Sequence, residues 1–193
     1  MTSITLSRQT KVENSAFPTG ARLTYHDAAP ARAEPRFTGG GGTGKSIAVL
    51  PPKYMGAAAG EYSNLSTVVQ DTVITDFKKY SAFKVLDKET LNRVLEETMD
   101  GVYEDNLDIV RLGHVTHTDY IITGNIVKTS TGYVMTLKIA NTRDGKVDFS
   151  HTEPCTLAAL ENLTSIHKTM AELLPQMGVA LTGKAERELT GQK

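Results

Sequence analysis

Residues 119–151 read DYIITGNIVKTSTGYVMTLKIANTRDGKVDFSH, and this stretch decides the fold. Over 120–128, 133–140 and 147–151 the composition is rich in β-branched and aromatic residues with alternating apolar positions, which is typical of strands. The two segments between these runs are rich in Gly, Asn, Asp and Thr, which favour tight turns. Three strands joined by short turns predict an antiparallel meander.

Strand and helix patterns alternate around this meander. The further segments with strand patterns are 47–50 and 83–86. The segments with apolar residues at helical spacing are 61–80, 87–95, 107–112, 157–177 and 182–189, the third of which stops at Gly113 and the last of which is short. The core order is β-α-β-α-α-β-β-β-α, which predicts an α/β fold: a mixed sheet with an antiparallel meander and helices packed against it.

Gly124 interrupts the apolar strand 120–128, where a glycine normally weakens packing. A glycine at this place indicates that a side chain is not tolerated there, because of a bulge or because another group approaches the backbone closely. We expect a covering helix to make that approach.

Composition divides the chain near residue 45. Residues 1–45 hold three of the seven prolines, carry an excess of basic side chains and end in a glycine-rich run, 39–44. Such a segment has little apolar surface to offset its ordering entropy. We expect 1–45 to be a flexible basic arm and linker, and 46–190 to be one α/β domain.

Charge and composition exclude several classes of protein. The 193 residues carry a net charge of −1, which does not favour nucleic acid as a partner. The apolar runs are far shorter than the ~20 residues that cross a bilayer, so no direct membrane insertion is expected. Cys155 is the single cysteine, so no intrachain disulfide is possible. The first twelve residues show neither a signal peptide nor a lipidation cysteine.

The run Gly39-Gly40-Gly41-Gly42-Thr43-Gly44-Lys45-Ser46 matches the phosphate-loop string G-x-x-x-x-G-K-[ST]. That chemistry needs a strand before the loop and a helix after it, because the helix N-terminus supplies aligned amides. Here no apolar strand precedes the glycines, and a strand follows Ser46. We interpret Gly39, Gly44, Lys45 and Ser46 as a chance match within a linker, with a nucleotide-binding protein as the alternative.

Other patterns for chemistry are weak. His114 and His117 stand near Asp119 as candidate metal ligands, but a third firm ligand is not evident. The nucleophile string G-x-S-x-G is absent. Cys155 follows a proline at the expected start of a helix and reads as a small packing residue. The sequence therefore predicts no catalytic residue, no cofactor and no metal.

Four segments together resemble a known family. They are Lys45–Pro52 (KSIAVLPP), Tyr80–Lys88 (YSAFKVLDK), Asp119–Ile126 (DYIITGNI) and Val134–Gly145. In this order they are similar to the family of the curli secretion component CsgG and the penicillin-binding-protein activator LpoB. Lys88 follows Asp87 where that family usually has arginine.

The resemblance implies a non-enzymatic protein-binding or scaffold module of the bacterial envelope or periplasm, of the type that activates a cell-wall synthase or assembles a secretion complex. It implies another envelope protein as partner, with an oligomer possible. It implies the same α/β fold, while the short connections argue against membrane-inserted hairpins. Two other readings stay open. One is the nucleotide-binding protein that uses Gly39–Ser46, and the other is one domain of a larger protein.

Overall fold

The computed structural model describes residues 34–39, 44–56, 63–99 and 106–191. The chain divides into two units, 1–33 and 34–193, and every described residue belongs to the second. Residues 1–33 and 40–43 of the expected arm lie outside the described residues. In chain order the elements are β1 (Phe37–Thr38), β2 (Ser46–Val49), β3 (Lys53–Met55), α1 (Ser63–Tyr80), β4 (Lys84–Leu86), α2 (Lys88–Met99), α3 (Asn106–Thr116), β5 (Tyr120–Lys128), β6 (Tyr133–Asn141), β7 (Val147–Cys155), α4 (Leu157–Glu161), α5 (Thr164–Gln176) and α6 (Gly183–Thr190).

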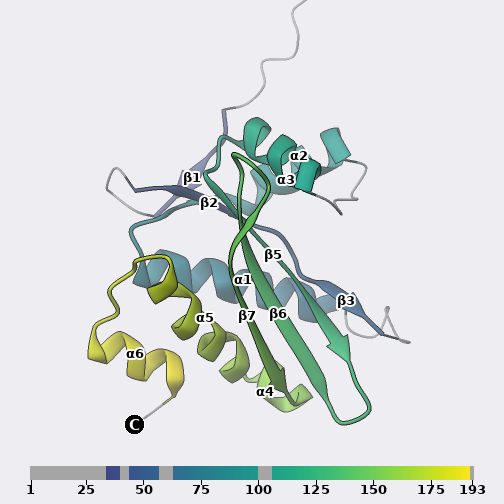
Figure 1. The fold of residues 1–193 in the computed structure, drawn as a ribbon, viewed down its shortest axis with the longest axis vertical. Helices are drawn as coiled ribbons and strands as arrows, with labels where there is room; N and C mark the ends of the chain where they lie inside the picture. The colour runs from purple at the N-terminus through teal and green to yellow at the C-terminus, as the bar shows by residue number, and fades with distance from the viewer. Residues whose placement is uncertain (1–33, 40–43, 57–62, 100–105, 192–193) are drawn as a thin grey trace, which may run out of the picture. The chain divides into compact units, whose positions relative to one another are not determined.

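The strands form one mixed sheet with the order β1-β4-β2-β5-β6-β7, and β3 pairs with β5 beyond the end of β2 (Figure 1). β2 runs parallel to both β4 and β5, whereas β5, β6 and β7 are antiparallel to one another. Both parts of the expected fold are confirmed: the sheet is mixed, and its last three strands are the predicted meander.

The two faces of the sheet carry separate apolar clusters, because side chains alternate along each strand. Val85, Met135 and Ile139 lie on one face, in the cluster that includes Phe77 of α1 and Leu173 of α5. The other face holds a smaller cluster beneath α2 and α3, formed by Ala48, Leu50, Leu86, Leu91, Leu112, Ile121 and Ala140 with their neighbours. α2 and α3 cover only the upper ends of the long strands (Figure 1).

Two short strands were not predicted. β1 lies inside the segment assigned to the arm, and it pairs antiparallel with β4 through Phe37↔Leu86 and Thr38↔Val85. β3 resumes the sheet after Pro51 and Pro52, which end β2. Strands of two and three residues carry no readable period, and their pairing comes from neighbours distant in sequence.

The predicted long helix 157–177 is wrong, because the structure contains two helices, α4 and α5. Leu163 separates them with a positive φ of 65°, and the side chain of Asn162 accepts a hydrogen bond from the amide of Thr164 (3.1 Å). Leu160 and Ile166 are both fully buried in one cluster, so the apolar spacing continues across the break. Periodicity alone therefore does not show that the helix ends.

Gly113 does not end its helix, since α3 continues to Thr116. A Cβ at Gly113 would overlap the side chain of Thr142, so the glycine serves close packing of α3 against the β6–β7 turn. The explanation expected for Gly124 is also wrong. A Cβ at Gly124 would overlap the carbonyl oxygen of Thr136, and the three atoms nearest to it all belong to the neighbouring strand β6 and not to a helix.

Candidate functional site

Asp119 of the DYIITG segment joins the first residues of two parallel strands. Its Oδ2 accepts hydrogen bonds from the backbone amide of Ser46 (2.7 Å) and from Ser46 Oγ (2.9 Å). The amide of Asp119 donates in return to the Ser46 carbonyl (3.0 Å). Ser46 is buried at the start of β2, so Asp119 satisfies polar groups that β2 presents before its ladder with β5 begins.

Asp119→Ala is expected to lower the free energy of unfolding by about 1–3 kcal/mol, because the buried amide of Ser46 loses its acceptor and the Ser46 hydroxyl keeps only the longer contact with the His117 carbonyl. Ser46→Ala removes only the hydroxyl and should cost less. Urea unfolding of both variants measures the difference. An equal cost for the two would mean that the amide of Ser46 gains nothing from the carboxylate.

Lys45 and Ser46 do not stand as a phosphate loop would require. Lys45 Nζ donates to the phenol oxygen of Tyr120 (2.8 Å), and this hydrogen bond raises the pKa of Lys45. Ser46 runs directly into β2, with no helix after it. Gly44 packs beside the carbonyl of Ala82, and Gly39 adopts a φ of 81° next to Lys78. No helix begins at the described residues of this string, 39 and 44–46, so these residues do not provide the helix N-terminus that would bind a phosphate.

The two candidate metal ligands lie at the end of α3. His114 is exposed on the helix, and His117 follows the helix with a positive φ of 54°. The carbonyl of His117 accepts a hydrogen bond from Ser46 Oγ (3.2 Å), which is a structural use of its backbone. Within the described residues, no group of three or more His, Cys, Asp or Glu is placed to hold a metal ion.

Cys155 is the last residue of β7, and it does not begin a helix as expected, because α4 starts at Leu157. Burial raises the pKa of the Cys155 thiol, although a hydrogen bond with the Ser165 side chain opposes this shift. A thiol with a raised pKa is a poor nucleophile near neutral pH. Cys155 therefore packs between β7 and α5, as the sequence indicated.

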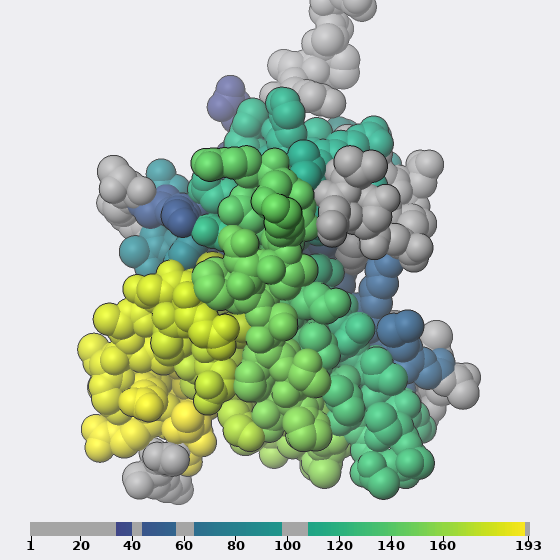
Figure 2. All heavy atoms as spheres, viewed as in Figure 1, coloured from purple at the N-terminus to yellow at the C-terminus, as the bar shows by residue number. Residues whose placement is uncertain are grey.

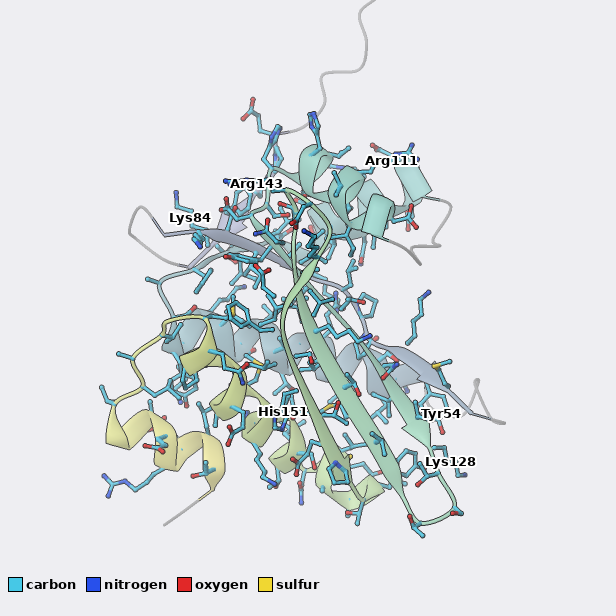
Figure 3. The ribbon with its side chains drawn as sticks, viewed as in Figure 1. Tyr54, Lys84, Arg111, Lys128, Arg143 and His151 are labelled. Carbon is cyan, nitrogen blue, oxygen red and sulfur yellow. The ribbon has the colours of Figure 1, made fainter. Side chains whose placement is uncertain are left out.

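A shallow depression of about 510 Å³ lies where β7 meets α4 and α5. Two charged residues of its lining face each other, because Glu153 Oε1 lies 2.6 Å from Lys168 Nζ. The other carboxylate oxygen, Glu153 Oε2, lies 3.5 Å from Nε2 of the neighbouring His151. His151 projects from β7 near the helical layer (Figure 3). The Glu153–Lys168 pair joins β7 to α5, whereas the His151–Glu153 contact lies within β7. The depression is lined by Glu153, Pro154, Cys155, Thr156, Ala159, Thr164, Ser165 and Lys168.

A second polar pair connects α1 to α5. Asp76 is a buried acidic residue of α1, and its side chain is 3% exposed. Its Oδ2 lies 2.8 Å from His167 Nδ1 of α5. Local sequence patterns do not reveal this pair, because 91 positions separate the two residues. The hydrogen bond to Asp76 is the main reason that the pKa of His167 is raised.

Protonation of His167 should make the stability depend on pH. Because the folded-state pKa is raised, the stabilisation is fully present below the unfolded-chain pKa of about 6.5 and is lost as pH rises through the higher folded pKa. The urea midpoint should therefore fall across this window. His167→Gln should flatten that part of the profile, whereas an unchanged slope in the variant would assign it to another group.

α2 and α3 cover the upper part of one sheet face. The lower part of that face is not covered by these helices. The register aligns its outward side chains in three rows across the strands. We call these rows the open face. The rows are Thr123, Lys138 and Ser150; Lys53, Asn125, Thr136 and Thr152; and Met55, Val127, Val134 and Pro154.

The last row of the open face is apolar along its whole length. Met55 is 54% exposed, and Val127, Val134 and Pro154 are half-buried or exposed. Figure 2 shows the green atoms of the long strands at the surface in the lower centre and right of the view, beside the yellow C-terminal helices. Tyr54 lies between Lys53 and Met55 in β3, and its side chain packs with the cluster on the opposite face (Figure 3). An antiparallel sheet with one solvated face usually alternates apolar-in and polar-out, and this outward apolar row departs from that pattern.

None of the described helices is both long and apolar enough to cross a bilayer. The sequence matches no family model, and it matches no curated protein.

Several solved structures are similar to the chain. The LpoB C-terminal domain from Salmonella enterica has 9% identity and a TM-score of 0.44, over 58% of this chain and 83% of that one. Escherichia coli LpoB has 10% identity and a TM-score of 0.45, over 79% and 83%. A PelC dodecamer from Paraburkholderia phytofirmans has 13% identity and a TM-score of 0.40, over 76% and 98%. Similarity at this level assigns neither a family nor a function to the chain.

Proposed function

We propose that the chain is a non-enzymatic protein-binding or scaffold module of a bacterial envelope-associated protein, and that its partner contacts the open face. The observation that carries this proposal is the outward apolar row, Met55, Val127, Val134 and Pro154, on a part of the sheet face that none of the described helices covers. Apolar side chains held in a flat, rigid array suit contact with a folded protein surface.

Polar residues of the four family-like segments support a non-enzymatic role, because their side chains make hydrogen bonds that stabilise the fold. Asp119 joins β2 to β5, and Asp87 accepts a hydrogen bond from the amide of Thr90 (3.2 Å) at the start of α2. Lys45 donates to Tyr120. These groups already have partners inside the domain, which leaves the surface to carry recognition. The envelope location and the partner class follow from the resemblance of the four segments and belong to the proposal.

The test compares two lysine substitutions on opposite sides of the domain. Val134→Lys places a charge in the middle of the apolar row, whereas Thr75→Lys places the same charge on an exposed position of α1. The full chain and both variants serve as bait for envelope extract of the source organism. A protein captured by the unmodified chain is then purified and titrated against all three by calorimetry.

We expect Thr75→Lys to bind the captured protein with unchanged affinity and Val134→Lys to bind it at least about tenfold more weakly, which is about 1.4 kcal/mol. Circular dichroism of each variant verifies that the fold is retained. Equal binding by Val134→Lys would place the contact away from the open face and overturn its assignment.

A further inference from the structure

β7 is the last strand of the sheet. It pairs with β6 from Val147 to Cys155, and no described strand lies on its other side. An exposed edge of nine residues is long enough to pair with another strand, and such edges commonly drive self-association. An antiparallel edge is also complementary to itself under two-fold symmetry, so a second copy of this chain always offers a matching edge.

Three features of β7 oppose such pairing. Pro154 lies inside the strand and has no amide proton to donate. The register shifts between Ile139 and Ala140, which pair with Phe149 and Val147, so Asp148 is an extra residue that distorts the edge. Glu153 turns a charged side chain toward the helical layer, where Lys168 holds it. Prolines, bulges and inward-pointing charges are known means of protecting an edge strand.

We infer that Pro154, the irregularity at Asp148 and the Glu153–Lys168 pair keep β7 from pairing with the β7 strand of a second copy. Without these features, β7 would be prone to pair with another strand. Val147 is 49% exposed and Phe149 is half-buried at the edge, so two paired β7 strands would gain apolar contact as well as backbone hydrogen bonds. Removing the protection therefore converts β7 into a self-pairing edge.

This inference does not depend on the proposed partner, and its test uses the full chain alone. The variant Glu153→Val/Pro154→Val removes two of the three features and leaves a run of β-forming residues. Ser150→Val is the matched control, since it raises strand propensity on the same strand without removing a protective feature. Light scattering after size exclusion gives the mass of each protein as a function of concentration, and hydrogen exchange reports on the amides of β7.

We expect the unmodified chain and Ser150→Val to share one mass, and the double variant to reach twice that mass with β7 amides that exchange at least about tenfold more slowly. An unchanged mass in the double variant would overturn the inference. So would added mass without slower exchange in β7, or a β7 edge already protected by a second copy in the unmodified chain. If the double variant does not fold, Pro154→Val alone, at an exposed position, is judged by the same criteria.

Discussion

Gly124→Ala is expected to lower the free energy of unfolding by about 3 kcal/mol, because the added methyl group would overlap the carbonyl oxygen of Thr136. Gly124 stands opposite Leu137 in the β5–β6 ladder, and Leu137 Cδ2 lies 2.9 Å from the position of the new Cβ. The obstructing carbonyl is backbone, so it cannot rotate away as a side chain would. Relief requires a shift of β5 against β6. Urea unfolding measures the cost.

Gly183→Ala is the matched control, since it makes the same chemical change in open space. No atom lies within 4 Å of a Cβ at Gly183, which is the first residue of α6. A glycine-to-alanine change in a helix is neutral to slightly stabilising when nothing obstructs it. A cost below about 0.5 kcal/mol for Gly124→Ala, or an equal cost at both positions, would contradict the close approach of β6.

Met135→Lys is expected to abolish the folded state under ordinary conditions. Met135 is 0% exposed in the cluster that also holds Leu173 of α5. A lysine there would bury an ammonium group among apolar side chains, at a cost of several kcal/mol, against a total stability of about 5–15 kcal/mol for a domain. Far-ultraviolet circular dichroism and a thermal melt would show loss of the cooperative transition.

Val134→Lys should keep the melt of the unmodified chain within a few degrees, although it changes the residue next to Met135. Successive side chains in a strand point to opposite faces, so Val134 belongs to the open face. The pair of variants thus tests which face of the meander is covered. If Val134→Lys also loses its cooperative transition, the face carrying Val127 and Val134 is covered, and the proposed interaction surface is wrong.

The meander and most helices could be predicted because their signal is local. The apolar residues of one strand or helix face the core, so they repeat within that element. This repeat is visible in the strands 120–128 and 133–141 and in the helix 63–80. β1 and β3 could not be predicted, because these short segments are strands through their pairing with β4 and β5, which are distant in sequence. The sequence pattern also did not predict the break between α4 and α5 at Leu163. Both helices pack on the same cluster, so their apolar residues continue with one helical period.

The candidate site was less predictable than the fold. The sequence offered the glycine-rich string and His114 with His117 only as weak candidates, and this stays a prediction. In the described residues Lys45 donates to Tyr120 and Ser46 begins β2. The sequence did not reveal the interactions Asp76–His167 and Glu153–Lys168. Such pairs join distant elements, and nothing in the local pattern of one element specifies the other.

The sequence by itself determined the α/β class, the antiparallel meander and the absence of any disulfide within the chain, since each depends on composition or on a short period. Only the tertiary structure decided that β7 is an edge and that Met55, Val127, Val134 and Pro154 form one outward row. The physical reason is register. Alternation shows that a strand has two faces, but only its pairing and the helices packed on it decide which face meets solvent.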